Sequence, residues 1–198
     1  MSNRRNRDKE KTIKDILTAA RRMFSEKGLH GTSLRDIELA SGVSKGLIMH
    51  HFETKENLYA AVKDQLSKEY ITTLAAKRST STSLPEIIQS AIRDSLNHTR
   101  NNHEFRRIAL WSYLEGLSHS SELDQRFTLS LIEAMHAGQE AGIVRRDINP
   151  ALMPFIIKGA IEYWIQKEEL IQKLIKNGQI PALTDEDLVN ALVRILIQ

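Results

Sequence analysis

The chain contains no cysteine among its 198 residues, which excludes disulfide bonds, thiolate catalysis and cysteine-ligated zinc. It also has no long uninterrupted apolar run, because Lys158 and Glu162 interrupt the most apolar stretch, residues 155–165. The basic residues near the N-terminus precede no apolar segment of the kind found in secretion signals. We therefore expect a cytoplasmic protein that does not enter a membrane.

The sequence also lacks the patterns of catalytic and metal sites. We find no paired carboxylates, no nucleophile beside a base and no phosphate loop at a credible spacing. His50 and His51 are adjacent, and helix neighbours point about 100° apart, so they cannot easily share a metal ion. His103 and Glu104 lack the second histidine of a zinc-protease helix. We expect no enzyme, no cofactor and no metal, and a small helical ligand carrier or enzyme is the weakest alternative.

Residues 32–52 predict two short helices around a tight turn. Ser33 can cap the first helix, and Gly42 can end it by adopting a positive φ. Ser44 is placed to cap a second helix that runs to about His51. The apolar stripe of the first helix consists of Leu34, Ile37 and Ala40. This is the pattern of a helix-turn-helix motif, whose second helix lies in the DNA major groove.

The same part of the chain carries a family resemblance. The matching positions in the motif are Ala40, Ser41, Gly42, Val43, Ser44, Lys45, Gly46, His50, His51, Phe52, Lys55, Glu56 and Leu58. Upstream they are Ile16, Leu17, Ala19, Ala20, Phe24, Gly28 and Thr32. Over roughly residues 13–62 the chain resembles the DNA-binding segment of TetR-type transcriptional regulators. Beyond this segment the resemblance is limited to the chain length, a helical pattern and a short similar stretch of sequence near Gly142.

The helical spacing and the resemblance together imply an all-α fold. Residues 1–55 are expected to form a three-helix DNA-binding domain, whose first helix runs from about Asp8 to Lys27. A long bridging helix, capped by Thr54, joins it to residues 56–198, the expected effector-binding and dimerisation domain. Residues 77–83 predict a loop. Further helices are expected to begin near residues 84, 103, 122, 150 and 184.

The net charge of +3 is unevenly distributed. Residues 1–55 hold 12 Lys or Arg and 7 Asp or Glu, a net charge of +5, whereas the rest of the chain has 16 and 18, a net charge of −2. A basic segment next to a helix-turn-helix motif is the charge distribution expected of a surface that binds DNA phosphates. For residues 1–8 alone, a solvated tail is an equal alternative.

We expect Ile48 and Phe52 to point into the core and the other side of the second motif helix to face DNA. Lys45 can reach a phosphate or a guanine edge, and His50 can bond to a base or a phosphate. The resemblance implies that Lys55 lies against a phosphate. The predicted DNA-binding set is Thr32, Ser33, Ser44, Lys45, Gly46, Leu47, Met49, His50, His51 and Lys55.

Two of these residues need a separate argument. Gly46 lies inside a helix at a cost of about 1 kcal/mol relative to Ala, which close approach of the backbone to DNA or to the first motif helix would explain. Met49 stands where the family commonly has a tyrosine whose hydroxyl meets a phosphate. Because methionine has no hydroxyl, that role does not carry over, and Met49 can only pack on sugar or a thymine methyl group.

The C-terminal part predicts a dimer. The expected penultimate helix has apolar residues on more than one face, and a last helix follows from Thr184. The resemblance implies that these last two helices form a four-helix bundle in a homodimer. A two-fold dimer would place two recognition helices about 34 to 36 Å apart, one turn of DNA. The alternative is that both helices are ordinary core helices of a monomer.

The resemblance also implies a small-molecule site between the middle helices. The candidate effector-binding residues are His103, Phe105, Trp111, Tyr113, Glu115, Phe127, Met135 and Trp164, with His119 as a further polar anchor. The alternative is that these aromatic residues are core, which is the commoner role of an aromatic stripe at helical spacing.

The function implied is a ligand-responsive, dimeric transcriptional repressor that a small-molecule effector releases from double-stranded operator DNA. An activator would have the same sequence pattern. A sequence-tolerant architectural DNA-binding protein is the main alternative, and it would bind DNA with little sequence preference and a strong salt dependence.

Overall fold

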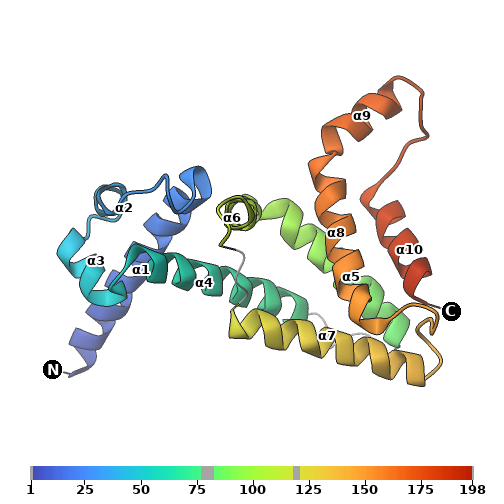
Figure 1. The fold of residues 1–198 in the computed structure, drawn as a ribbon, viewed down its shortest axis with the longest axis horizontal. Helices are drawn as coiled ribbons and strands as arrows, with labels where there is room; N and C mark the ends of the chain where they lie inside the picture. Colours follow the sequence, from blue (N-terminus) through green and yellow to red (C-terminus); the bar gives the residue numbers. More distant parts are fainter. Residues whose placement is uncertain (1, 77–82, 118–120, 198) are drawn as a thin grey trace. The chain divides into compact units, whose positions relative to one another are not determined.

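The computed structural model describes residues 2–76, 83–117 and 121–197, with side chains from residue 7 onward except that of residue 76. These residues are helical apart from turns and one isolated antiparallel bridge between Val144 and Ile197 (Figure 1). No helix among them is long and apolar enough to cross a membrane. Most of the predicted 77–83 loop, His119 and the side chains of Arg4 and Arg5 lie outside the described residues.

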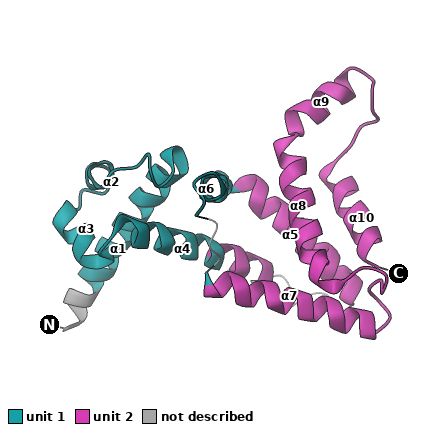
Figure 2. Cartoon of the chain, viewed as in Figure 1, with its two compact units in different colours: residues 1–68, 102–121 teal, residues 69–101, 122–198 magenta. Residues whose placement is uncertain are grey.

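The chain divides into two compact units (Figure 2). Unit 1 comprises residues 1–68 and 102–121, and unit 2 comprises residues 69–101 and 122–198. The long helix α4, Lys55–Ala76, contributes residues to both units. The proposed division between a DNA-binding and a sensing domain at residue 55 therefore remains a prediction about function.

Unit 1 is built around the first three helices. It contains α1 (Ser2–Lys27), α2 (Leu34–Ser41), α3 (Lys45–Phe52), the first part of α4 and α6 (His103–Leu114). Its largest fully buried side chains are Ile16, Phe24, Leu29, Ile37, Ile48, Leu58 and Val62, and Ile108 of α6 joins the same core. Phe24 packs edge-on against Tyr59 of α4, with 4.9 Å between ring centroids. The short motif helices are thus stabilised by α1, α4 and α6 together, because neither buries enough apolar surface alone.

Local capping explains where the motif helices begin and end. The Ser33 hydroxyl accepts the Asp36 backbone N–H and the Asp36 carboxylate accepts the Ser33 backbone N–H, which forms a capping box at the start of α2. Gly42 ends α2 in the left-handed region at φ 70°. Ser44 caps α3, as predicted. Helix α1 begins at Ser2, earlier than the predicted start near Asp8.

Unit 2 contains the remaining helices. These are α5 (Leu84–Asn101), α7 (Glu122–Glu140), the 3-10 turn η1 (Pro150–Leu152), α8 (Met153–Gln166), α9 (Glu168–Lys176) and α10 (Asp185–Leu196). Its core includes Ile88, Ile92, Leu96, Met135, Val144, Met153, Ile161, Val189, Leu192 and Leu196. Asn149 caps η1, and Thr184 forms a capping box with Asp187 at the start of α10, which agrees with the predicted starts near residues 150 and 184.

Helix α9 was not predicted, and α8 is therefore not the penultimate helix. Lys167 ends α8 and begins α9 with φ −99° and ψ 9°, so the break is a single residue. Neither proline nor glycine marks it. The spacing of Leu170, Ile171, Leu174 and Ile175 is the sequence signal that predicts this helix.

Candidate nucleic-acid interface

Helix α3 exposes the side that the sequence predicts to face DNA. Ile48 is fully buried and Phe52 packs against the unit 1 core, as expected. On the other side, two residues are half-buried, Met49 and His51. The remaining residues there are exposed: Ser44, Lys45, Gly46, Leu47 and His50. The first turn of α3 is therefore fully accessible, which is the part of a recognition helix that meets base edges.

The turn before α3 is fixed by side chains of α2. The Lys45 backbone N–H donates to Glu38 Oε1 at 2.9 Å, and the Val43 N–H donates to Ser41 Oγ at 3.1 Å. These bonds satisfy backbone groups that the turn leaves without helical partners. They also tie the start of α3 to α2, so the two motif helices form one rigid piece.

Gly46 lies in open space. A Cβ atom at this position would meet no atom of the protein within 4 Å. Close contact with the first motif helix is therefore not the reason for glycine, and of the two explanations offered by the sequence only an external partner remains.

The rings of the two adjacent histidines of α3 contact each other edge-on. Their ring centroids are 5.4 Å apart with the rings at 61°. Burial lowers the pKa of His51 below its usual value, and the nearby charges of His50 and Lys9 lower it further. The neutral imidazole of His51 is thus favoured at pH 7. Among the described residues, no three His, Asp or Glu side chains gather as a metal site.

Two residues of the predicted DNA-binding set make hydrogen bonds to the protein's own backbone. Thr32 is only 1% exposed, and its hydroxyl donates to the Gly28 carbonyl at 2.7 Å. Its side chain is therefore not at the surface, contrary to expectation. The Lys55 ammonium donates to the carbonyl oxygens of Leu29 and Thr32, at 2.7 and 2.8 Å. Lys55 thus anchors the turn before α2, whatever contact it makes with DNA.

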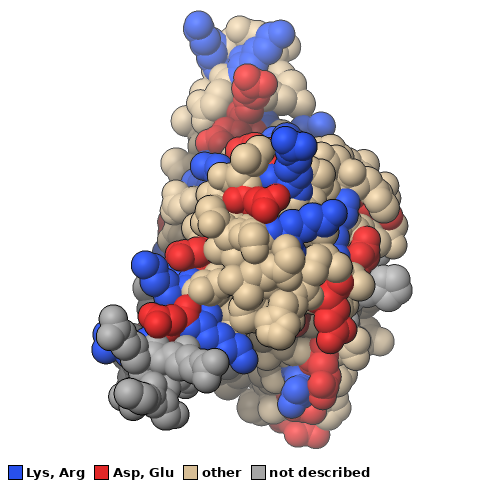
Figure 3. All heavy atoms as spheres, turned by 90° about the vertical axis from the view of Figure 1, so that its left-hand side faces the viewer, with Lys and Arg blue, Asp and Glu red and all other residues tan. Residues whose placement is uncertain are grey.

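The surface charge is mixed. Figure 3 shows one face of the molecule, where Lys and Arg side chains are separated by Asp and Glu side chains. Among the side chains that the structure describes, Lys and Arg therefore form no continuous patch on this face. The arrangement leaves individual cations, such as exposed Lys45, to make separate phosphate contacts.

The effector candidates on α6 mostly have a structural role. The Glu115 carboxylate accepts the backbone N–H groups of Leu29 and His30, both at 2.9 Å. The Trp111 indole N–H donates to the Ser25 carbonyl at 3.2 Å, and Phe105 packs against the unit 1 core. His103 is exposed, and Tyr113 is 77% exposed. Three of these five residues, Phe105, Trp111 and Glu115, thus contact α1 or the turn that follows it.

The candidates in unit 2 are also dispersed. Met135 is a buried core residue, and Phe127 packs edge-on against Tyr70 with 6.1 Å between ring centroids. Burial raises the Tyr70 pKa, although its hydroxyl bonds to Ser95 Oγ at 2.8 Å. Of the predicted set, Trp164 lines a cavity of about 220 Å³ with Arg100, Glu168, Ile171, Gln172, Leu183, Thr184 and Asp185.

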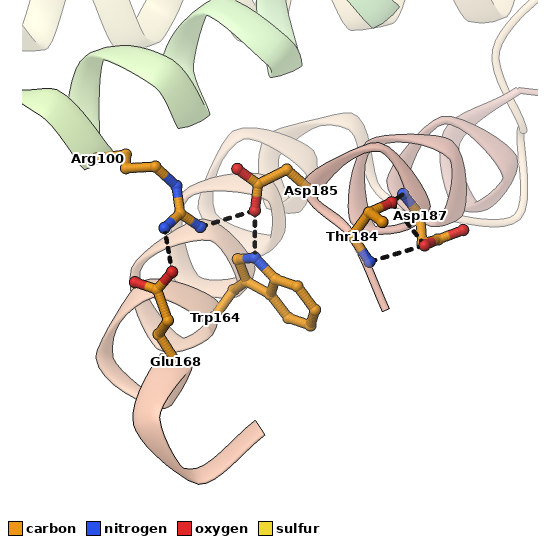
Figure 4. Close-up of polar contacts among 6 residues, drawn as sticks. All are labelled: Arg100, Trp164, Glu168, Thr184, Asp185 and Asp187. Carbon is orange, nitrogen blue, oxygen red and sulfur yellow. Dashed lines mark hydrogen bonds and ion pairs between the residues drawn. The ribbon is translucent and has the colours of Figure 1, made fainter. Parts of the chain in front are cut away.

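Figure 4 shows the polar cluster beside this cavity. Arg100 donates to Glu168 Oε1 at 2.6 Å and to Asp185 Oδ1 at 2.7 Å, and Asp185 Oδ1 also accepts the Trp164 indole N–H at 2.8 Å. The cluster joins α5, α8, α9 and α10. Sequence reasoning missed it because Arg100 lies 68 and 85 positions before its partners, and no local pattern links them.

Comparison with known proteins agrees with this geometry. The family model described as "Bacterial regulatory proteins, tetR family" matches residues 16–62, from the middle of α1 into α4. The chain belongs to the TetR family of helix-turn-helix transcriptional regulators. The matched segment contains both motif helices and every residue of the predicted DNA-binding set.

Relatives of this regulator match well beyond the motif. The HTH-type transcriptional repressor AcnR of Corynebacterium glutamicum is 29% identical over 159 residues, which cover 74% of this chain and 78% of AcnR. The HTH-type transcriptional repressor KstR2 of Rhodococcus jostii is 29% identical over 155 residues, which are 70% of each chain. The crystal structure of a TetR family transcription regulator from Marinobacter aquaeolei has a TM-score of 0.76 at 20% identity and covers 98% of both chains. The fold is thus shared over nearly the whole length.

Proposed function

We propose that this TetR-family regulator is a dimeric repressor that binds operator DNA through α3 in the cytoplasm and is released by a small-molecule effector. The observation that carries the proposal is the open first turn of α3, where exposed Ser44, Lys45 and Leu47 surround a glycine that no part of the protein approaches. Relatives that are named as repressors support repression over activation.

The contacts we propose follow from side-chain chemistry. Lys45 binds a phosphate or a guanine edge, and His50 distinguishes bases by donating or accepting a hydrogen bond. Leu47 and half-buried Met49 can pack on sugars and thymine methyl groups. Exposed Ser44 lies at the N-terminus of α3, where the positive end of the helix dipole favours phosphate. The Ser33 hydroxyl and backbone N–H are both bonded to Asp36, so Ser33 can contact DNA only by sharing these groups.

We propose that α8 and α10 form the dimer interface. Helix α8 buries Met153, Ile161 and Ile165 in its own core but leaves other large apolar residues exposed. These are Leu152, Phe155, Ile156 and Tyr163, and Ile195 of α10 is 40% exposed. Gly159 lies in open space on the same helix, which allows a partner helix to approach closely. Contiguous exposed apolar surface of this kind is typical of a protein interface.

Release by an effector requires that it bind the DNA-incompetent conformation more tightly than the competent one. A coupling free energy of about 1 to 3 kcal/mol weakens operator affinity about 5- to 150-fold. The cavity lined by Trp164 in unit 2 is one place where such a compound can bind. A compound that binds the regulator tightly and leaves operator affinity unchanged across a broad screen would contradict this coupling.

Selection from random duplex DNA tests the proposal. The enriched duplex and a scrambled duplex of the same composition are then compared by fluorescence anisotropy at near-physiological salt. A specific regulator is expected to prefer the enriched duplex by at least about a thousandfold. Equal affinity for both, with the steep salt dependence of phosphate contacts alone, would instead indicate an architectural DNA-binding protein.

A further inference from the structure

The turn between α1 and α2, residues 28–32, is held from two sides by opposite charges. From α6, the Glu115 carboxylate accepts the backbone N–H groups of Leu29 and His30, one on each oxygen. From α4, the Lys55 ammonium donates to the carbonyl oxygens of Leu29 and Thr32. Because charge-assisted hydrogen bonds are about twice as strong as neutral ones, this pair of side chains fixes the turn more firmly than an ordinary loop.

The fit of α6 against this turn is close. Gly28 adopts φ 72°, and a Cβ atom there would lie 2.5 Å from Glu115 Oε1 and 2.9 Å from the Trp111 ring. A side chain at Gly28 would therefore require the Glu115 carboxylate and the Trp111 ring to shift, in addition to the strain of the positive φ.

Helix α6 also binds the last carbonyl groups of α1. Arg107 Nε donates to the Ser25 carbonyl at 2.5 Å, and Arg107 Nη2 donates to the Glu26 carbonyl at 3.0 Å. Trp111 supplies a further N–H to Ser25. The Arg107 cation thus lies at the C-terminal end of α1, where the helix dipole is negative, and the Glu115 carboxylate accepts the N–H groups that follow this end.

The turn is the direct start of the DNA-binding motif. Ser33, the next residue, is the N-cap of α2, and the Glu38 bond to the Lys45 N–H ties α2 to α3. A displacement of residues 28–32 is therefore passed to α2 and α3 as one piece. Groups that make directional bonds need placement within about 0.5 Å, so a small displacement is enough to disturb base contacts.

We propose that Glu115 is a positioning residue for DNA recognition, because its two bonds hold the turn from which α2 and α3 follow. The inference rests on the proposed function, because it assumes that α3 contacts the operator. It assigns Glu115 to positioning of the DNA-binding motif in place of effector binding.

The substitution Glu115→Gln tests it with almost no change of shape. An amide keeps one acceptor oxygen but turns an NH₂ group toward the second backbone N–H, so one of the two bonds is lost. We expect affinity for the enriched duplex to fall about tenfold, because a turn held by one of these bonds in place of two is less often in the position that α3 needs for base contacts. Affinity for a scrambled duplex, which depends on phosphate contacts, should change about twofold or less.

The matched control is Glu122→Gln. This carboxylate also makes a charge-assisted pair, with Arg126 Nη2 at 3.1 Å, but it lies in unit 2 on α7, outside the proposed dimer interface. Its operator affinity should equal that of the wild type. An equal loss in both variants would overturn the inference, because it would reflect a general loss of charge or stability.

Hydrogen exchange on the unaltered protein gives an independent result should Glu115→Gln fail to fold. Operator DNA is expected to slow exchange of the Leu29 and His30 amides, because DNA binding and the Glu115 bonds favour the same turn position and such coupling is reciprocal. Unchanged exchange at both amides would overturn the inference.

The two proposals fail separately. If the wild type shows no preference for any duplex, the proposed function fails. If the wild type is specific and Glu115→Gln keeps the full specificity ratio, the function stands and the role of Glu115 is wrong.

Discussion

At the scale of single residues, the structure separates side chains that face outward from those that hold the motif in place. Ser33, Gly42 and Ser44 were predictable as helix ends because each acts on its own neighbours. Lys55 and Glu115 were not, because their partners lie 23 to 86 positions away in the chain. Hydrogen bonds between neighbouring residues can be predicted from a sequence pattern. The sequence does not distinguish a charged side chain that contacts DNA from one that bonds to the protein's own backbone.

Gly46 offers the sharpest residue-scale prediction. Its surroundings are open and its φ is not positive, so Gly46→Ala should stabilise α3 by up to about 1 kcal/mol, seen as a higher melting temperature. If DNA approaches this backbone closely, the same methyl group should weaken operator binding at least several-fold by anisotropy. A variant that is more stable and binds the operator as tightly as before would contradict close approach at Gly46.

At the scale of secondary structure elements, local capping accounts for most of the helix boundaries. Helix α10 begins after Thr184 because Asp187 completes a capping box, and η1 begins after Asn149 because its side chain accepts the Ala151 N–H. Helix α9 was missed because its boundary, at Lys167, is a one-residue break without a breaker residue. The orientation of α6 residues could not be predicted either, since apolar spacing does not show which neighbour a helix contacts.

The capping box of α2 predicts an acid-sensitive element. The hydrogen bond from the Ser33 hydroxyl lowers the Asp36 pKa most, with smaller contributions from the Ser33 backbone N–H and the charge of Lys27. A carboxyl group whose pKa is lower in the folded state stabilises the fold above its unfolded pKa, and this stability is lost as pH falls through the folded value. Asp36→Asn should therefore lower the melting temperature at pH 7, and the difference from wild type should shrink below about pH 4.

The corresponding control is Glu122→Gln, an exposed carboxylate paired with Arg126 one helical turn away. Its melting temperature should stay close to that of the wild type at both pH values. An Asp36→Asn difference that does not change between pH 7 and pH 3 would show that the capping carboxylate is not the acid-sensitive group.

At the scale of the whole molecule, the all-α class and the helix-turn-helix were predictable, because the helices have regular apolar spacing and the motif is local. The effector site remains a prediction, because helical spacing does not decide which aromatic residues line a cavity. Trp111 and Met135 show why: both have the spacing of pocket residues, yet one bonds to α1 and the other is buried in unit 2. Side-chain type alone does not distinguish a cavity wall from a core.

The dimer is the prediction that belongs to this scale. Phe155 of α8 is 59% exposed, so Phe155→Glu should leave the monomer folded but place a charge in the proposed interface. Sedimentation at micromolar concentration should show a dimer for the wild type and a monomer for this variant. Leu129→Glu on α7 is the matched control, because Leu129 is 57% exposed and lies outside the proposed interface. A monomeric wild type, or a Phe155→Glu variant that remains dimeric, would contradict the interface.

The measurement that tests the central claim most directly is anisotropy on duplexes in which the spacing of the two half-sites is changed. A dimer with two α3 helices one DNA turn apart should bind the selected duplex with two chains per site. Five inserted base pairs rotate the half-sites to opposite sides of the helix, so affinity should fall toward that of a single half-site. Ten inserted base pairs return the two half-sites to the same side of the DNA but leave them farther apart than the two α3 helices, so binding should remain weak. Full affinity at every spacing would contradict a dimer that contacts two half-sites together.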